Sequence, residues 1–232
     1  MSPLTLLALA CAPGLALIVY VYLKDEYDRE PILLLIWAFV LGVFSTVPAI
    51  LLESAATGLG FSESSSALMN FFFAFGIVGF SEEVSKLLMI LVFIYRNKNF
   101  DEPFDGIVYA VMVSMGFATL ENILYVWEGG VHVAMVRMFT AVPAHATFAV
   151  IMGYYIGIAK FHPREKWRYI FMGLGGAIIF HGAYDFFLFN QINTGIVGGA
   201  MLSLVVAIYL SRQAMKLHLA RSPFNPESSK GD

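Results

Sequence analysis

The chain has 232 residues, of which 59% are hydrophobic and only 13% are charged, and its formal net charge is −3. A soluble domain carries roughly 25% charged residues, so this composition excludes an ordinary soluble protein and indicates an integral membrane protein. One cysteine, Cys11, excludes an internal disulfide, and the length allows one compact domain with no separate soluble module.

The apolar segments predict an all-α fold, a polytopic helical bundle in a membrane. A spanning helix needs about 20 mainly apolar residues. On this basis about seven transmembrane helices are predicted, at 4–23, 32–53, 68–95, 104–127, 133–160, 167–190 and 196–211. We expect residues 1–216 to form the membrane domain. Residues 217–232 are expected to form a disordered cytoplasmic tail, because its end is polar and contains two prolines.

Basic residues are confined to alternate links between these segments. All 14 except Lys86 and Arg137 lie at 24–31, 96–103, 160–168 or beyond 211. The positive-inside rule therefore places the N-terminus outside and the C-terminus in the cytoplasm. The charge-dense 24–31 link is interpreted as a solvated cytoplasmic turn, and Arg137, near an outer helix end, is expected to extend its side chain to the membrane interface. The distribution of the basic residues is explained by membrane topology, and nothing indicates a nucleic-acid partner.

Ionisable residues occur inside four of the predicted spans, where each charge costs roughly 2.5–3.5 kcal/mol on insertion scales. In chain order they are Glu82, Glu83 and Lys86; Glu121 with Asn122; His145; and His181 with Asp185. At 1.5 Å per residue, Glu121, His145 and His181 lie roughly 9–17 Å from the outer ends of their helices, and Glu82 reaches a comparable level. Four polar helices at one depth predict a functional cavity in the outer half of the membrane.

Helical spacing relates these residues to one another. Residues four apart share a helix face, so Glu82 can pair with Lys86, and Asp185 can hold the His181 ring. Glu83 leaves the helix about 100° away from Glu82. We therefore expect one of the two carboxylates to face the reaction centre while the other supports it.

Each feature also has a purely structural explanation. The Glu–Lys contact and the His181–Asp185 contact could be buried structural pairs, and Glu121 could be a hydrogen-bonding partner in helix packing. His145, close to Pro143, could be a core histidine. The shared depth of the four helices favours a functional cavity over these explanations.

The residue types indicate hydrolysis of a carbonyl compound. A carboxylate beside an imidazole, out of bulk water, can activate a water molecule as a general base. A histidine–aspartate pair can orient that water or stabilise the oxyanion of a tetrahedral intermediate. Alternatively Glu121, His145 and His181 could supply three zinc ligands and leave a fourth position for water. The sequence contains no HExxH motif, so the cofactor stays open, with zinc as a candidate.

Three motifs resemble those of the PrsW family of bacterial intramembrane proteases: Glu82-Glu83-Val84-Ser85-Lys86, Gly116-Phe117-Ala118-Thr119-Leu120-Glu121-Asn122 and His181-Gly182-Ala183-Tyr184-Asp185. The segments 22–31 and 104–109 resemble connecting segments of the same family, and the resemblance covers nearly all of residues 12–190. This family is related to the CAAX prenyl proteases. The chain departs from their pattern at Glu121, which replaces a histidine, and at Lys86, where those relatives carry arginine one position later.

The resemblance implies an intramembrane peptidase of metallo- or glutamic type, in a multi-pass protein of the bacterial cell membrane. It also implies site-1 cleavage of a single-pass membrane protein, an anti-sigma factor, on the outer side of the membrane during envelope stress. Residues 1–216 would then be a transmembrane protease domain.

Roles for the site residues follow from the motifs and the chemistry together. Glu82 is the expected general base, with Glu83 as its support, or the reverse. His181 is expected to orient water or stabilise the oxyanion, and Asp185 to hold His181. Lys86, Glu121, Asn122 and His145 are expected to support the site. Glu121 and His145 would be metal ligands if a metal is bound.

Three other functions stay open. A proton-coupled membrane transporter also uses buried glutamate, histidine and lysine, but it predicts inverted repeats, and none is visible in the sequence. A non-catalytic sensor or scaffold would tolerate Glu82→Gln. A CAAX-type prenyl-protein protease would place the polar site toward the cytoplasm, where prenylated tails arrive.

Overall fold

The structure, a computed structural model, describes residues 2–190 and 194–226, with the side chains of 194–197 excepted. Within these residues the chain is helical and contains no strand. Two π-helical stretches, η1 and η2, flank α4, so that the helix runs on without a break from α3 through η2. The elements are α1 (Pro3–Lys24), α2 (Ile32–Gly58), α3 (Ala67–Phe71), η1 (Phe72–Val78), α4 (Gly79–Met89), η2 (Ile90–Ile94), α5 (Pro103–Phe139), α6 (Ala141–Phe161), α7 (Lys166–Phe189) and α8 (Thr194–Ala220).

The predicted all-α membrane bundle is confirmed. Among the described residues, five helical stretches are long and apolar enough to cross a membrane: Pro3–Lys24, Ile32–Gly58, Pro103–Phe161, Lys166–Phe189 and Gly198–Ala220. The third of these combines α5 with α6. The stretch from α3 to η2 is not among the five and consists of short α- and π-helical pieces. The exact number of crossings and the sides of the termini stay predictions.

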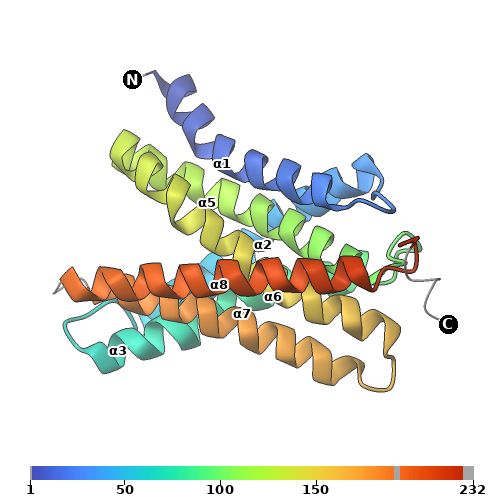
Figure 1. The fold of residues 1–232 in the computed structure, drawn as a ribbon. Coiled ribbons are helices and arrows are strands. Elements are labelled where there is room, and N and C mark those ends of the chain that lie inside the picture. The colour runs from blue at the N-terminus through green and yellow to red at the C-terminus, as the bar shows by residue number, and fades with distance from the viewer. Residues whose placement is uncertain (1, 191–193, 227–232) are drawn as a thin grey trace.

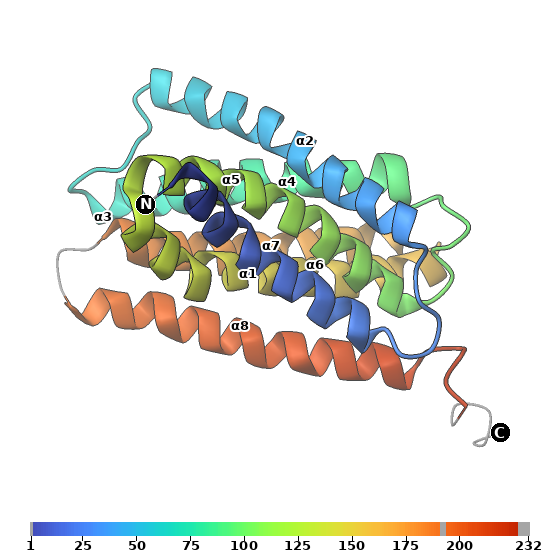
Figure 2. The ribbon, with the colours of Figure 1, turned by 90° about the horizontal axis from the view of Figure 1, so that it is seen from above.

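The bundle is built around α5 and α6. Helix α5 packs against α1, α2 and α6, and α6 packs in turn against α7 and α8. Helix α4 contacts both α2 and α7 and so closes the bundle on the side away from α1 and α8 (Figures 1 and 2). Helix α1 begins and α8 ends at opposite ends of the bundle (Figure 1).

Glycines allow α5 and α6 to approach closely. A Cβ atom on Gly153 would lie 2.3 Å from the carbonyl oxygen of Gly106, and one on Gly106 would lie 2.5 Å from the carbonyl oxygen of Gly153. Neither contact is possible for a larger residue, which is the usual reason for small residues at helix interfaces in membranes. The close contact fixes α6, which carries His145, against α5, which carries Glu121.

The boundary between α5 and α6 differs from the prediction. Helix α5 continues to Phe139, and residues 133–139, predicted to open the next span, form its end. Gly130 interrupts α5 with φ 67° and ψ −156°, a conformation that glycine adopts without steric cost. Gly130 lies in the predicted link between the spans 104–127 and 133–160, so hydropathy located this break. It did not locate the second break at Thr140, with φ −125° and ψ −79°, because that residue lies inside a mainly apolar run.

The 24–31 link is not the solvated turn that its charges predict. Asp25 and Glu30 are 0% and 5% exposed, and the Tyr109 hydroxyl donates a hydrogen bond to Glu30. Glu102 and Asp105, at the start of α5, are buried as well. The link folds back onto the beginning of α5, so its carboxylates face protein instead of water.

This burial makes the stability of the protein depend on pH. Burial, together with the nearby charge of Glu102, raises the pKa of Asp25 to about 7, and burial also raises the pKa of Glu30. The folded protein therefore keeps protons that the unfolded chain loses above about pH 4. Stability should fall as pH rises from about 4 to about 7 and stay lower above that range. We expect Asp25→Asn to weaken this fall and to raise the unfolding midpoint at pH 8 by about 2–4 °C for each kcal/mol recovered.

Thermal unfolding of the detergent-solubilised protein between pH 4.5 and 8 would test this expectation. Glu26→Gln is the matched control, because Glu26 lies in the same link and is exposed. Parallel pH profiles for Asp25→Asn and the wild type would contradict the assignment.

The C-terminal helix is longer than predicted. Helix α8 continues to Ala220, past the expected helix end at 211 and the expected domain boundary at 216. Residues 218 and 222 are buried, so the part of the expected tail that directly follows the boundary packs against the bundle. Residues 227–232 of that tail lie outside the described residues.

Candidate active site

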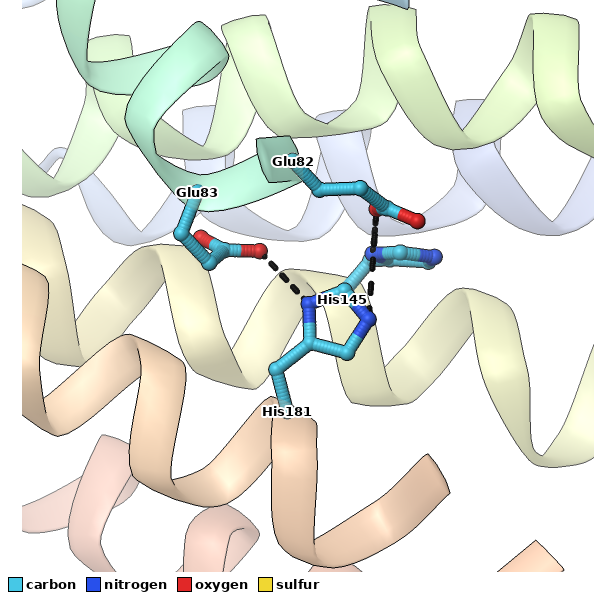
Figure 3. Close-up of side chains that lie close together, drawn as sticks. All are labelled: Glu82, Glu83, His145 and His181. Atoms are coloured by element: carbon cyan, nitrogen blue, oxygen red, sulfur yellow. Dashed lines mark hydrogen bonds and ion pairs between the residues drawn. The ribbon is translucent and has the colours of Figure 1, made fainter. Parts of the chain in front are cut away.

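Four buried side chains from three helices point toward one another (Figure 3). Glu82 and Glu83 come from α4, His145 from α6 and His181 from α7, and none is more than 4% exposed. One oxygen or nitrogen from each residue lies within 4.8 Å of those from the other three. We call these residues the four-residue cluster. It includes four of the site residues that the sequence singled out.

The two glutamates converge, which the sequence did not predict. Glu83 Oε1 lies 2.9 Å from His181 Nδ1. Glu82 Oε2 lies 3.9 Å from His145 Nδ1 and 3.9 Å from His181 Nε2. The expectation that only one carboxylate faces the centre is therefore wrong. Although the two side chains leave α4 about 100° apart, each has three rotatable bonds with which to reach the same point.

Lys86 reaches into the same cluster. Its Nζ donates to Glu83 Oε1 at 2.8 Å and to Glu82 Oε2 at 3.1 Å, and it lies 3.3 Å from His145 Nδ1. The ammonium also lies 4.1 Å from the centroid of the Phe117 ring. The predicted pairing with Glu82 is present, and the structure adds Glu83 as a second carboxylate partner.

A carboxylate outside the cluster holds each imidazole. Asp185 Oδ2 lies 3.2 Å from His181 Nε2, as the spacing of four residues predicts. Glu121 Oε2 lies 3.0 Å from His145 Nε2, a contact between two helices. A proton on Nε2 of either ring would bind its carboxylate and leave Nδ1 facing the cluster.

Arg137 belongs to the site and does not extend to the membrane interface as predicted. Its Nη2 lies 2.5 Å from Glu121 Oε2, and its Nε donates to Asn122 Oδ1 at 2.9 Å. Asn122 is fully buried and donates to the carbonyl oxygen of Ala10 at 2.8 Å. The guanidinium also lies over the Tyr125 ring, 4.2 Å from its centroid. Because the break at Gly130 redirects the end of α5, sequence spacing alone could not reveal this contact.

A cavity of about 630 Å³ adjoins the cluster. Glu82, His145 and His181 line it, and so do Glu121, Arg137 and Asp185, whereas Glu83 does not. Helix α2 forms part of its wall through Thr46, Ala49, Ile50 and Glu53.

Glu53 is a polar residue of this cavity that sequence reasoning missed, because it was taken as the end of a predicted helix. It accepts a hydrogen bond from Ser81 Oγ at 2.8 Å, next to Glu82. Its one signal in the sequence was a carboxylate at the edge of an apolar run.

The donor set fits a zinc ion. Carboxylate oxygen and imidazole nitrogen are both zinc donors, and a catalytic zinc site has three protein ligands with one position left for water. The carboxylates on the far nitrogens of His145 and His181 match the arrangement that fixes metal-bound histidines. Of the three metal candidates from the sequence, His145 and His181 belong to the cluster, while Glu121 lies outside it and holds the His145 ring.

Comparisons with a family model and with individual proteins indicate the same family. Residues 30–211 match the family model described as PrsW family intramembrane metalloprotease. A protein of Bacillus subtilis (strain 168) named Protease PrsW is 42% identical over 184 residues, which are 76% of this chain and 79% of that protein. A protein of the same name in Geobacillus kaustophilus (strain HTA426) is 38% identical over 85% of this chain and 86% of that protein. One in Clostridioides difficile (strain 630) is 36% identical over 84% of this chain and 83% of that protein. No solved structure matches the chain.

The family match spans most of the membrane bundle and all four members of the cluster. It favours a protease over the transporter, the sensor and the prenyl-protein protease that the sequence left open. Together with the apolar helices it also indicates a multi-pass protein of a bacterial membrane. The chain belongs to the PrsW family of intramembrane metalloproteases.

Proposed function

We propose that this protease makes the site-1 cut in a single-pass membrane anti-sigma factor, at a peptide bond on the outer side of the membrane. The substrate class rests on membership of the PrsW family, and the observation that carries the side of the cut is the place of the cluster, beside a cavity in one half of the bundle. His145 lies in the first turns of α6, and His181 lies in the C-terminal half of α7, so both lie in the half of the bundle that the charge bias assigns to the outside.

We assign the roles within the cluster by access to the cavity. Glu82 lines the cavity and is the general base that takes a proton from the attacking water. Glu83, which does not line the cavity, would hold a zinc ion together with His145 and His181. A zinc ion held there supplies a Lewis acid for the substrate carbonyl and lowers the pKa of bound water.

The groups around the cluster position its members. Asp185 keeps the His181 ring in place, and Glu121 does the same for His145. Arg137 neutralises Glu121, and its guanidinium lines the cavity, where its N–H groups could donate to a developing oxyanion. Polar groups on the wall also suit an extended substrate, because a peptide that leaves its helix in a membrane needs new partners for its backbone N–H and C=O groups.

Cleavage in lipid vesicles tests the proposal. The purified protein would be reconstituted with a tagged single-pass anti-sigma factor from the same bacterium, and the products would be identified by mass spectrometry. We expect one cut at the outer side of the substrate segment, and none with Glu82→Gln.

A single-pass protein of similar length with no sigma factor partner is the matched control. Equal cleavage of both proteins, or a cut at the cytoplasmic side, would contradict the proposed substrate or the proposed side. Either result would leave the protease itself intact.

A further inference from the structure

Lys86 lies inside the donor set that would hold the metal. Its Nζ is within 2.8 Å of Glu83 Oε1, 3.1 Å of Glu82 Oε2 and 3.3 Å of His145 Nδ1. These atoms belong to three of the four residues whose donors converge in the cluster. The Lys86 side chain is only 2% exposed, so the ammonium is shielded from bulk water.

The ammonium and a metal ion would bind the same donor atoms. Zinc binds carboxylate oxygen and imidazole nitrogen at about 2.0–2.2 Å, and an ammonium group makes its hydrogen bonds to the same atoms at a longer distance. His145 Nδ1 has one lone pair, which cannot serve the ammonium and the metal at the same time, whereas each carboxylate oxygen has two. Two cations within a few ångströms of each other also repel strongly in a buried site. The two occupants therefore exclude each other.

We propose that Lys86 is an internal placeholder cation, which holds the cluster together when no metal is bound and withdraws from it when the metal enters. This inference rests on the proposed function, because it takes the metal to bind at this donor set. Lys86 is then a positioning residue that lowers the apparent metal affinity of the site. In return, the metal-free protein keeps its fold.

The burial of the glutamates explains why a placeholder is needed. The Glu82 and Glu83 side chains are 5% and 2% exposed and adjacent in sequence. Without a cation they would be two neighbouring buried carboxylates, and uncompensated buried charge is strongly destabilising. Phe117, whose ring lies 4.1 Å from Nζ, can still contact the ammonium after the carboxylates turn to the metal.

Zinc affinity of Lys86→Met tests the inference. Metal-free wild type, Lys86→Met and Lys160→Met would each be titrated with zinc in competition with a chromophoric chelator. We expect Lys86→Met to bind zinc at least about tenfold more tightly than the wild type, since the metal no longer displaces a cation. Lys160→Met is the matched control, because Lys160 is a half-buried lysine that donates to the backbone oxygens of Tyr95 and Asn97, away from the cluster, and its zinc affinity should not change.

Thermal unfolding with and without zinc separates a placeholder from a merely structural residue. A placeholder predicts that Lys86→Met unfolds at a lower temperature than wild type without zinc, and that zinc raises its midpoint by more than it raises that of the wild type. If Lys86 is merely structural, Lys86→Met should lower the unfolding midpoint by the same amount with and without zinc. If Lys86→Met folds only with zinc present, its affinity is measured by transfer of the bound zinc to the chelator, and Lys86→Gln gives a second variant without the charge.

Unchanged or weaker zinc affinity in both Lys86 variants would overturn the inference and leave the metal assignment in place. Failure of the wild type and of every variant to bind zinc would overturn the inference and the metal assignment together.

Discussion

Glu82→Gln is expected to lower the rate of peptide-bond cleavage by about a thousandfold while the protein stays folded. Glutamine keeps the size of the side chain and can still contact Lys86, but it cannot accept a proton from water. Positioned general bases contribute about 10²–10⁴-fold to catalysis. Glu82 is the glutamate of the cluster that lines the cavity, so its loss should act on the chemical step more than on substrate binding. Single-turnover cleavage of a reconstituted single-pass substrate would measure this directly.

Glu30→Gln is the matched control for this variant. Glu30 is a buried carboxylate that accepts a hydrogen bond from Tyr109, and it lies in the link before α2, outside the site. Its replacement should leave the rate of cleavage within about twofold of the wild type. If folded Glu82→Gln kept a tenth or more of the wild-type rate, Glu82 could not be the base, and the assignment would pass to Glu83.

Removal of the metal is expected to abolish cleavage, and zinc is expected to restore it. Two imidazoles and a carboxylate form a donor set that binds zinc far better than magnesium. Zinc should also stabilise the fold, by about 2.7 kcal/mol when its concentration is one hundred times the dissociation constant. Cleavage and the unfolding midpoint would therefore be measured after treatment with a strong chelator, and again after zinc is added back.

Magnesium added after the chelator is the control, and it should restore neither cleavage nor the midpoint. A sample with less than a tenth of an equivalent of bound metal and full activity would contradict a metal mechanism. The cluster would then act as a glutamic-type site, in which Glu82 and Glu83 with the two histidines activate water on their own.

The site takes its rigidity from contacts on both sides of each imidazole. His181 is held within its own helix by Asp185, four residues away. His145 is held from another helix by Glu121, which Arg137 fixes in turn. A ring oriented by a carboxylate on one nitrogen presents the other nitrogen in a fixed direction, and such partners commonly change metal affinity or activity by 10–100-fold.

Much of the fold was predictable from the sequence. The apolar stretches give the helices and the membrane location, because burial in lipid requires long runs of apolar residues with internally satisfied backbones. The polar residues inside them identified Glu82, Glu83, His145, His181 and Asp185, because a charged group inside a membrane is costly and is therefore rare without a function. The pairing of Asp185 with His181 followed from helical spacing alone.

Contacts between helices were not predictable in the same way. The sequence placed Arg137 at the interface, whereas the break at Gly130 turns its side chain toward Glu121. The angle between Glu82 and Glu83 on the helix predicted that their carboxylates would point apart, whereas the carboxylates of both residues lie in the same cluster. The 24–31 link was interpreted as solvated, whereas it packs onto the start of α5 and buries Asp25.

Hydropathy and helical period are properties of neighbouring residues, so the sequence by itself determined that this chain is a helical membrane protein with costly polar groups at one depth. The rotation of each helix, the angle at its ends and the path of each long side chain depend on the surfaces that pack against it. Only the tertiary structure therefore decided that Lys86 lies among the donors of the cluster, that Arg137 binds Glu121, and that a cavity reaches Glu82 but not Glu83.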